Sequence, residues 1–264
     1  MIGRKSLRIG VVSLGMVVVG ASAAMAQVDK TPDIATTVPG SWSVDRFAPC
    51  QFDKANGVHG RDNVLQLGVC GSDHQSDSFL NYQGMQIAID GVGTTPPASQ
   101  SLSMDFFINS AWATDASGQV STSMWSRVNQ VATDAEATAW YPILGFTNEV
   151  GGVGEFRYWN STLGWQDLAA TVNYDAWNTL KIVYTDNVVQ AYVNGNLEYT
   201  ETADAGTARL TAAFVEDKNF GGRDYTANIS NVSVTGTPEP ASVALMATGL
   251  IGVVGMGYKK RRNG

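Results

Sequence analysis

Acidic side chains are the first candidates for chemistry, because hydrolysis of a glycosidic bond uses two carboxyl groups held a few ångströms apart. The nearest acidic groupings are Glu216 with Asp217, and Glu198 with Glu201. Neither grouping puts carboxylates at alternating positions, which would share one face of a β-strand. The chain also lacks the G-x-S-x-G motif of many serine hydrolases and has only 2 histidines. We therefore expect that the protein is not an enzyme and has no catalytic residue.

Tryptophan is the other residue type with recognisable chemistry, and the chain has 7 of them. Trp159 and Trp165 flank residues 160–164, whose Asn, Ser, Thr and Gly residues are typical of a hairpin turn. Indole rings near a loop can stack on the apolar face of a sugar ring, and Tyr158 and Gln166 would add hydrogen bonds. The alternative is that both indoles pack in the sandwich or cover its edge. The candidates for carbohydrate binding are Trp159, Trp165 and Tyr158.

Carboxylates in loops are candidates for binding Ca²⁺, which prefers oxygen ligands. Those in or near expected loops are Asp73, Asp77, Asp90, Asp217 and Asp224. The alternative is that these side chains are simply solvated. His74 stands between Asp73 and Asp77, but one histidine without a second such ligand is weak evidence for a transition metal. We expect no required cofactor, and a structural Ca²⁺ stays open.

The N-terminus has the three parts of a secretory signal peptide. The charged residues at its start are Arg4, Lys5 and Arg8. An apolar core follows over residues 9–20, and small residues precede a cleavage site after Ala26. We predict a signal peptide over residues 1–26 and an N-terminal extension over residues 27–37, with a retained membrane anchor as the alternative.

Export changes the meaning of Cys50 and Cys70, the only cysteines in the chain. An oxidising compartment favours a disulfide between them. Such a bond closes a loop of about 20 residues and stabilises the fold by about 3 kcal/mol in the chain-entropy model. Cys–His catalysis with His59 or His74 is the alternative, but nothing else in this segment resembles a nucleophile site. We predict the disulfide.

The C-terminus combines a proline-rich motif, an apolar stretch and a basic cluster. Pro238-Glu239-Pro240 precedes residues 241–258, which carry no charge and nearly span a bilayer core. The basic residues that follow, and would stop the chain at the cytoplasmic side, are Lys259, Lys260, Arg261 and Arg262. An ordinary C-terminal anchor is the alternative, although it would not need the Pro-Glu-Pro motif.

This order of parts over residues 237–264 resembles the PEP-CTERM sorting signal. The resemblance implies that an exosortase in the inner membrane of a Gram-negative bacterium recognises Pro238, Glu239 and Pro240. It also implies that the tail is removed, and that the protein is released to the cell surface or the extracellular polysaccharide. The inner membrane would then hold the precursor only transiently.

Charge excludes one class of partner. Residues 27–237 carry 23 acidic and 10 basic side chains. A body with this excess of negative charge repels the phosphates of nucleic acid and anionic lipid. We therefore expect no nucleic-acid partner.

The sequence of the body, residues 38–236, predicts short strands in a single all-β domain. In residues 177–199, Leu180, Ile182 and Tyr184 alternate with more polar residues, and Asn194-Gly195 is a strong hairpin turn signal. Other expected strands are Val64–Val69, Ser101–Ile108, Ser121–Val128, Ile143–Thr147, Glu155–Trp159, Trp165–Leu168, Arg209–Val215 and Tyr225–Val234. Many short strands with turns between them predict a β-sandwich.

One part of this pattern resembles a known architecture. The meander from Trp177-Asn178-x-Leu180 to Tyr192-Val193-Asn194-Gly195 looks like that of laminin-G and concanavalin-A-like jelly rolls, with an unrelated sandwich as the alternative. The resemblance implies that Trp177 lies in the core and that the last strand, with Ile229–Val234, pairs beside the first. The E-x-D-x-x-E motif of laminarinase-like relatives is absent.

We expect an exported, exosortase-sorted surface or extracellular-matrix protein, non-enzymatic and associated with polysaccharide. A lectin-like carbohydrate-binding module is the alternative, and a glycan hydrolase is the third reading. The expected partners are signal peptidase and exosortase during export, and extracellular polysaccharide afterwards.

Overall fold

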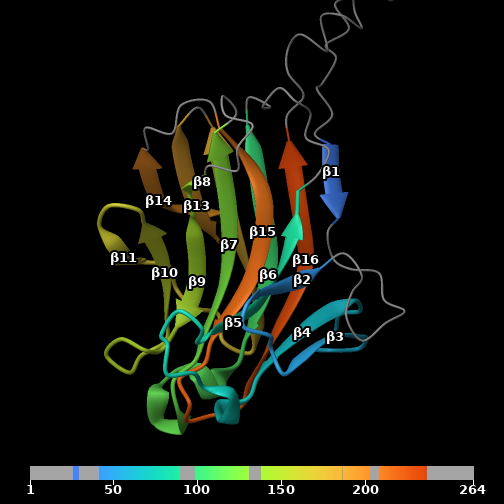
Figure 1. The fold of residues 1–264 in the computed structure, drawn as a ribbon, viewed down its shortest axis with the longest axis vertical. Coiled ribbons are helices and arrows are strands. Elements are labelled where there is room, and N and C mark those ends of the chain that lie inside the picture. The colour runs from blue at the N-terminus through green and yellow to red at the C-terminus, as the bar shows by residue number, and fades with distance from the viewer. Residues whose placement is uncertain are drawn as a thin grey trace, which may run out of the picture.

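Two antiparallel β-sheets face each other across a hydrophobic core (Figure 1). The computed structural model describes residues 26–29, 42–89, 99–130, 138–185, 187–202 and 208–236. We call the two layers sheet A and sheet B. Each has eight strands, seven of them in one continuous path.

Sheet A contains, in spatial order, β14 (Asn196–Thr202), β13 (Val188–Val193), β12 (Ala176–Thr185), β6 (Gln100–Ile108), β16 (Tyr225–Gly236), β4 (Val64–Val69) and β3 (Gln51–Ala55), with β1 (Ala26–Asp29) beside β16. Sheet B contains β11 (Gly164–Asp167), β10 (Glu155–Asn160), β9 (Ile143–Thr147), β7 (Ser121–Gln130), β15 (Ala208–Lys218), β5 (Tyr82–Ala88) and β2 (Ser43–Arg46), with β8 (Thr138–Trp140) beside β7. Three short 3₁₀ helices lie in the loops: η1 (Gly71–Asp73), η2 (Ser110–Trp112) and η3 (Asp115–Ser117).

The meander expected from the sequence is confirmed as β12, β13 and β14. Leu180, Ile182 and Tyr184 point into the core, because successive side chains of a strand point to opposite faces. Asn194 and Gly195 both have positive φ, of 51° and 84°, so they form the turn that the Asn-Gly pair predicts. The sequence pattern therefore placed one edge of sheet A correctly.

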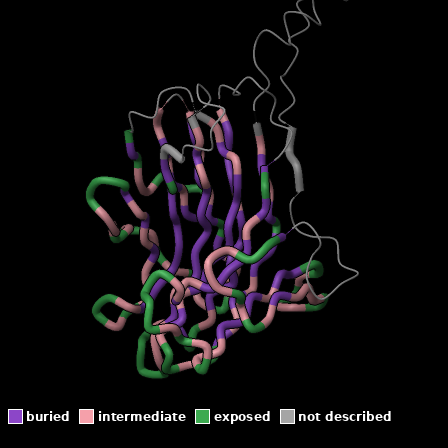
Figure 2. Tube along the Cα trace, viewed as in Figure 1, coloured by how far each residue is buried: buried purple, intermediate pink, exposed green. Residues whose placement is uncertain are grey.

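The core lies between the sheets and takes one residue in two from the long strands. Figure 2 shows buried stretches along these strands and exposed residues mainly in the loops. The largest fully buried side chains include Tyr158, Phe106, Phe146 and Phe156. This alternation explains why a sandwich with short strands holds together. The expected β-sandwich is confirmed.

The last strand lies inside sheet A and not at its edge. β16 pairs with β6 and β4 along its length and with β1 at its C-terminal end. β1 lies ahead of the body expected over residues 38–236, and the first described strand of that body, β2, belongs to sheet B, so the expected pairing of the last strand with the first strand of the body is not observed among the described residues. Trp177 differs from expectation: it is only partly buried, on the face of sheet A that points away from sheet B, where the Arg61 guanidinium lies 4.3 Å from its ring.

The expected disulfide is confirmed between Cys50 and Cys70, whose Cα atoms lie 5.9 Å apart. It joins the residue before β3 to the residue after β4. A disulfide is typical of proteins outside the reducing cytoplasm.

Both predicted targeting segments fall outside the described residues. The signal peptide does so except for Ala26, and the sorting signal over residues 237–264 does so entirely. In the described part of the chain, no helix is long and apolar enough to cross a membrane.

Candidate functional site

A second hydrophobic cluster lies on the face of sheet B that points away from sheet A, which we call the open face. Its buried members are Trp125, Ile143, Ala212 and Phe214, and the partly buried Tyr82, Trp159 and Trp165 pack against them. These residues alternate along their strands with residues of the main core. Sheet B is thus apolar on both sides, which distinguishes it from a sheet whose second face is only solvated.

The register of the strands lines up the side chains of this cluster. Matching positions on β11, β10, β9, β7 and β15 are taken by Trp165, Trp159, Ile143, Trp125 and Phe214. We call this row the apolar band. Four spacings between neighbouring strands make it roughly 19 Å long. The Trp159 and Trp165 rings meet edge to face, with centroids 5.4 Å apart.

A polar row runs beside the apolar band, two residues further along each strand. From β11 to β2 it contains Asp167, Arg157, Gly145, Ser123, Glu216, Gly84 and Asp45. Arg157 Nε lies 3.1 Å from Asp167 Oδ1, which forms an ion pair at one end of the row. Gly145 and Gly84 have no side chain, so the surface of the sheet is lower at these two positions of the row.

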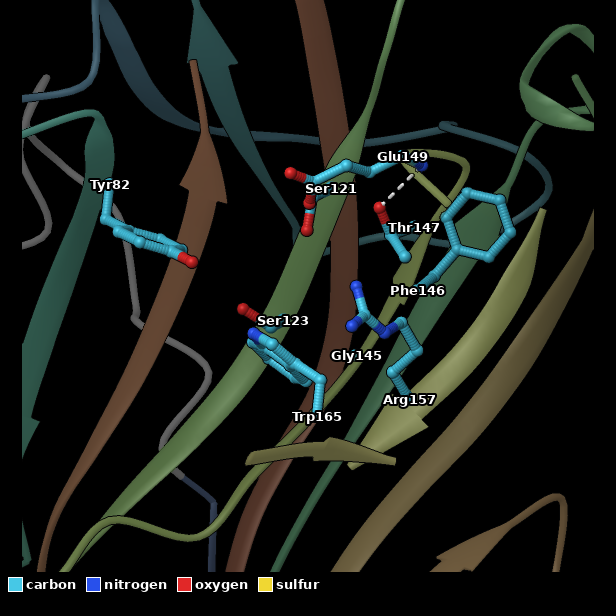
Figure 3. A pocket seen from close by; sticks show the side chains of 9 residues that line it. All are labelled: Tyr82, Ser121, Ser123, Gly145, Phe146, Thr147, Glu149, Arg157 and Trp165. Atoms are coloured by element: carbon cyan, nitrogen blue, oxygen red, sulfur yellow. Dashed lines mark hydrogen bonds between the residues drawn. The ribbon is translucent and has the colours of Figure 1, made fainter. Parts of the chain in front are cut away.

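A shallow depression that is open to solvent lies over the first of these low places (Figure 3). Its floor includes Gly145 and Ser123. Figure 3 shows the Tyr82 hydroxyl and the Arg157 guanidinium pointing toward the space from opposite sides, with Trp165 beside them. Rings and polar groups that converge on a concave surface are typical of small-ligand sites.

Charged groups around the depression act on Tyr82. Burial raises the pKa of the Tyr82 hydroxyl, and the Glu149 carboxylate raises it further. The guanidinium groups of Arg46 and Arg157 act in the opposite direction. The hydroxyl is therefore protonated at neutral pH and can donate a hydrogen bond to a ligand.

The second low place in the polar row holds two carboxyl groups. Asp45 and Glu216 both pair with Gly84, one from each neighbouring strand. Burial raises the pKa of Glu216 well above its usual range, and the nearby Asp45 carboxylate adds to this effect. The Arg46 guanidinium lies 4.1 Å from the centre of the Trp125 ring and 4.4 Å from that of Phe79, and it acts in the opposite direction on this pKa.

Sequence reasoning missed this pair because it looked for carboxylates on one strand. Glu216 faces the open side, and its neighbour Asp217 points to the core side, where burial raises its pKa as well. The partner of Glu216 is Asp45, which is far away in the sequence and reaches it across β5. The only local signal is Gly84, whose missing side chain leaves room for the pair.

The structure brings Trp159 and Trp165 together on the open face, partly buried, and so keeps them as candidates for sugar stacking. Tyr158 is different, and its assignment to the site is corrected. It is fully buried in the main core, and its hydroxyl donates a 2.7 Å hydrogen bond to Glu201 Oε2. Burial and this carboxylate raise the pKa of Tyr158. The tyrosine that reaches the depression is Tyr82.

The candidate Ca²⁺ ligands do not converge. Asp224 accepts a hydrogen bond from the Gly71 amide, Asp77 caps the Phe79 amide, and Asp217 is buried in the core. Asp90 lies outside the described residues. Within the described ranges, the grouping that could hold a metal is Cys50, Cys70 and Asp73, but the disulfide engages both sulfur atoms. The structure assigns no cofactor.

No family model and no curated protein matches this chain. Solved structures with a similar fold include a sialidase, at 13% identity and a TM-score of 0.48, over 81% of this chain and 19% of the sialidase. The chain thus spans about a fifth of that protein. A prokaryotic β-1,3-1,4-glucanase (lichenase) from a mouse hindgut metagenome matches at 11% identity and a TM-score of 0.45, over 81% of this chain and 99% of the lichenase. An alginate lyase of polysaccharide lyase family 7 matches at 14% identity and a TM-score of 0.43, over 65% of this chain and 77% of the lyase.

The expectation that this protein is not an enzyme is corrected; the solved structures named above include a lichenase and an alginate lyase, both of them enzymes. That expectation came from a search for carboxylates along single strands, which could not find the carboxyl pair that two strands bring together on the open face. The β-sandwich itself is shown by the pairing of the strands into two sheets over one core.

Proposed function

We propose that the open face of sheet B binds a polysaccharide chain. The observation that carries this proposal is the pair of partly exposed rings, Trp159 and Trp165, beside a depression with convergent polar groups. A sugar ring has an apolar face and a rim of hydroxyl groups. Indole rings suit the first, and the Tyr82 hydroxyl and the Arg157 guanidinium suit the second.

The shape of the site favours a chain over a single sugar. Trp159 and Trp165, at one end of the apolar band, are partly exposed beside the depression, so a ligand that covers the depression can extend over their rings; the buried Trp125, Ile143 and Phe214 only support this end of the band. The depression lies to one side of the band and is shallow, so it suits the hydroxyl groups of a sugar ring that lies over it. A polymer would lie across the strands with one unit over the depression.

Binding is tested by titrating the full-length protein with a panel of polysaccharides. Trp165→Ala should weaken the binding by about tenfold or more, since buried aromatic anchors dominate such contacts. Trp177→Ala is the matched control, because Trp177 is also partly buried but lies on the outer face of sheet A. Equal losses in the two variants, or no binding to any polysaccharide, would refute the proposal.

Export to the cell surface or extracellular matrix is the second part of the proposal. The Cys50–Cys70 disulfide supports an oxidising compartment. The sequence of residues 1–26 and 237–264 supports entry through signal peptidase and sorting by an exosortase that reads Pro238-Glu239-Pro240. Mass spectrometry of the protein from its native cells tests both cuts. A protein that retains either terminal segment contradicts this route.

Glycan cleavage is a second candidate function, because Glu216 lies beside Asp45 on the same face and burial raises its pKa. Both Glu216 carboxyl oxygens are buried in this structure, so cleavage requires the side chains that cover them to move aside. Glu216 would give its proton to the glycosidic oxygen as the C–O bond breaks. Water would add to the anomeric carbon, and Asp45 would take the proton that this water loses. Reducing ends released from a bound polysaccharide by the wild type, but not by Glu216→Gln, would support cleavage. Equal release by both proteins would exclude this role of Glu216.

A further inference from the structure

The charged groups that line the depression already have partners of opposite charge. Arg157 pairs with Asp167 at 3.1 Å, and Lys218 Nζ lies 2.5 Å from Glu149 Oε1. Arg46, at the edge of the same face, lies 3.7 Å from Asp45. A charged ligand would therefore have to displace a carboxylate or an ammonium group of the protein before it found a free partner. That exchange leaves one charge of the protein without its partner, which costs free energy.

The polar lining offers both donors and acceptors at short range. The Arg157 guanidinium can only donate, and the Glu149 carboxylate can only accept. The hydroxyl groups of Tyr82 and Ser121 can do either. A carboxylate or sulfate on a ligand could satisfy only the donors, and an ammonium group only the acceptors. Alcohol hydroxyl groups satisfy both kinds.

The charge of the whole body points the same way. Between residues 27 and 237 acidic side chains outnumber basic ones by 23 to 10, so the long-range field repels polyanions. On the open face itself, the charges of the three ion pairs cancel. Glu155, which lies near Arg157 and Asp167, adds one negative charge, and Arg127, which donates a hydrogen bond to Thr211 Oγ1, adds one positive charge, so these two also cancel. Neither the local nor the overall charge recruits an acidic polysaccharide.

We infer that the ligand of the open face is a neutral, hydroxyl-rich polysaccharide, and that the Arg157–Asp167 and Lys218–Glu149 ion pairs select against charged chains. This inference rests on the proposed function and names the class of its ligand. These ion pairs fix the positions of side chains that can hydrogen-bond to hydroxyl groups. Because each charge is already paired, uronate, sulfate and ammonium groups find no unpaired charge to bind.

Two matched pairs of polymers test the inference. Polygalacturonate and its methyl ester differ in charge on the same chain, as do chitosan and chitin hexamers. For full-length wild type, the neutral member of at least one pair should bind about tenfold more tightly than its charged counterpart. Its affinity should stay within about twofold between roughly 0.02 and 0.5 M NaCl, since binding by hydroxyl groups is little screened.

A gain of binding makes the test independent of losses from misfolding. Asp167 is 56% exposed, so Asp167→Asn should fold normally and leave Arg157 without its carboxylate. This variant should bind polygalacturonate about tenfold more tightly than wild type, with a strong dependence on salt. Asp53→Asn, on β3 of sheet A, removes the same charge elsewhere and should not change the preference.

The outcomes distinguish a wrong ligand class from a wrong binding site. If polygalacturonate binds wild type as tightly as its ester, or if Asp167→Asn gains nothing, the neutral class is wrong while the binding face stands. If no polymer, neutral or charged, binds wild type, both this inference and the proposed function fail.

Discussion

The carboxyl group of Glu216 lies over Gly84, in the space that any other residue would fill with its side chain. A Cβ atom on Gly84 would overlap the Glu216 carboxyl group and the Val215 carbonyl oxygen. Gly84 pairs with Asp45 on its other side. The glycine thus allows acids from two strands to meet on one face, and it links the packing of sheet B to the chemistry of its open face.

Substitution of this glycine should be costly. Gly84→Ala forces backbone or side-chain shifts of the kind that destabilise well-packed proteins by about 1–3 kcal/mol. Urea unfolding measures this loss. Gly222→Ala is the control, because nothing lies within 4 Å of its Cβ position. If Gly84→Ala and Gly222→Ala are equally stable, the Glu216 side chain does not lie where the structure places it.

The proton on Glu216 makes stability depend on pH. Its pKa in the folded protein is raised by burial and by Asp45, so the folded state keeps a proton that the unfolded chain releases above about pH 4. The group's contribution to stability is therefore full below that pH and is lost as pH rises toward the folded pKa. Glu216→Gln should gain stability relative to wild type between pH 4 and pH 8, as measured by urea unfolding.

Asp175 gives a control of opposite sign. A hydrogen bond from the Ser110 amide lowers its pKa, so its contribution is present above the unfolded pKa and is lost as pH falls. Asp175→Asn should therefore lose stability relative to wild type at pH 7, and less of it at pH 3. A Glu216→Gln curve that runs parallel to the wild type would contradict the raised pKa of Glu216.

Tyr158 should matter for stability and not for ligand binding. Its hydroxyl is one of several donors to the buried Glu201 carboxylate, with the Ser161 amide and hydroxyl at 3.0 and 2.6 Å. Tyr158→Phe should cost about 1–3 kcal/mol, since it leaves a buried acceptor short of one hydrogen bond. Tyr82→Phe should instead weaken glycan binding with little change in unfolding. If Tyr158→Phe weakened glycan binding and Tyr82→Phe lowered the stability, the site would not lie on the open face of sheet B.

The disulfide should supply a measurable share of the stability. Cys50→Ala with Cys70→Ala should lower the free energy of unfolding by about 3 kcal/mol, because the bond restricts the unfolded chain. Calorimetry of wild type in reducing buffer should show the same loss. The open face lies on sheet B, while the bond joins the ends of β3 and β4 in sheet A, so binding at low temperature should persist. A stability unchanged by the double substitution contradicts this prediction.

The parts of the fold that local patterns specify were predictable from the sequence. β4 and β9 match their expected ranges, Val64–Val69 and Ile143–Thr147, because each is a short apolar run between turn residues. β5 was not predicted: its sequence YQGMQIA contains a glycine and a buried Gln83, which break the alternation that marks a strand. Packing between neighbouring strands, which no local window contains, decides its conformation.

The site was predictable only where it is local. Trp159 and Trp165 are neighbours across one hairpin, so their contact follows from the turn between them. Tyr158 could have been excluded, because adjacent residues of a strand point to opposite faces. Tyr82, Asp45 and Glu216 come from three strands that are distant in the sequence, and only the order of the strands in sheet B joins them.

Protection of tryptophan side chains from oxidation by a bound glycan tests the central claim most directly. Full-length protein is oxidised with and without a saturating neutral polysaccharide, and each tryptophan is quantified by mass spectrometry. Binding on the open face predicts protection of Trp159 and Trp165, with Trp177 on sheet A oxidised at the same rate in both samples. Protection confined to Trp177, or no protection of Trp159 and Trp165 at saturation, would contradict the proposed site.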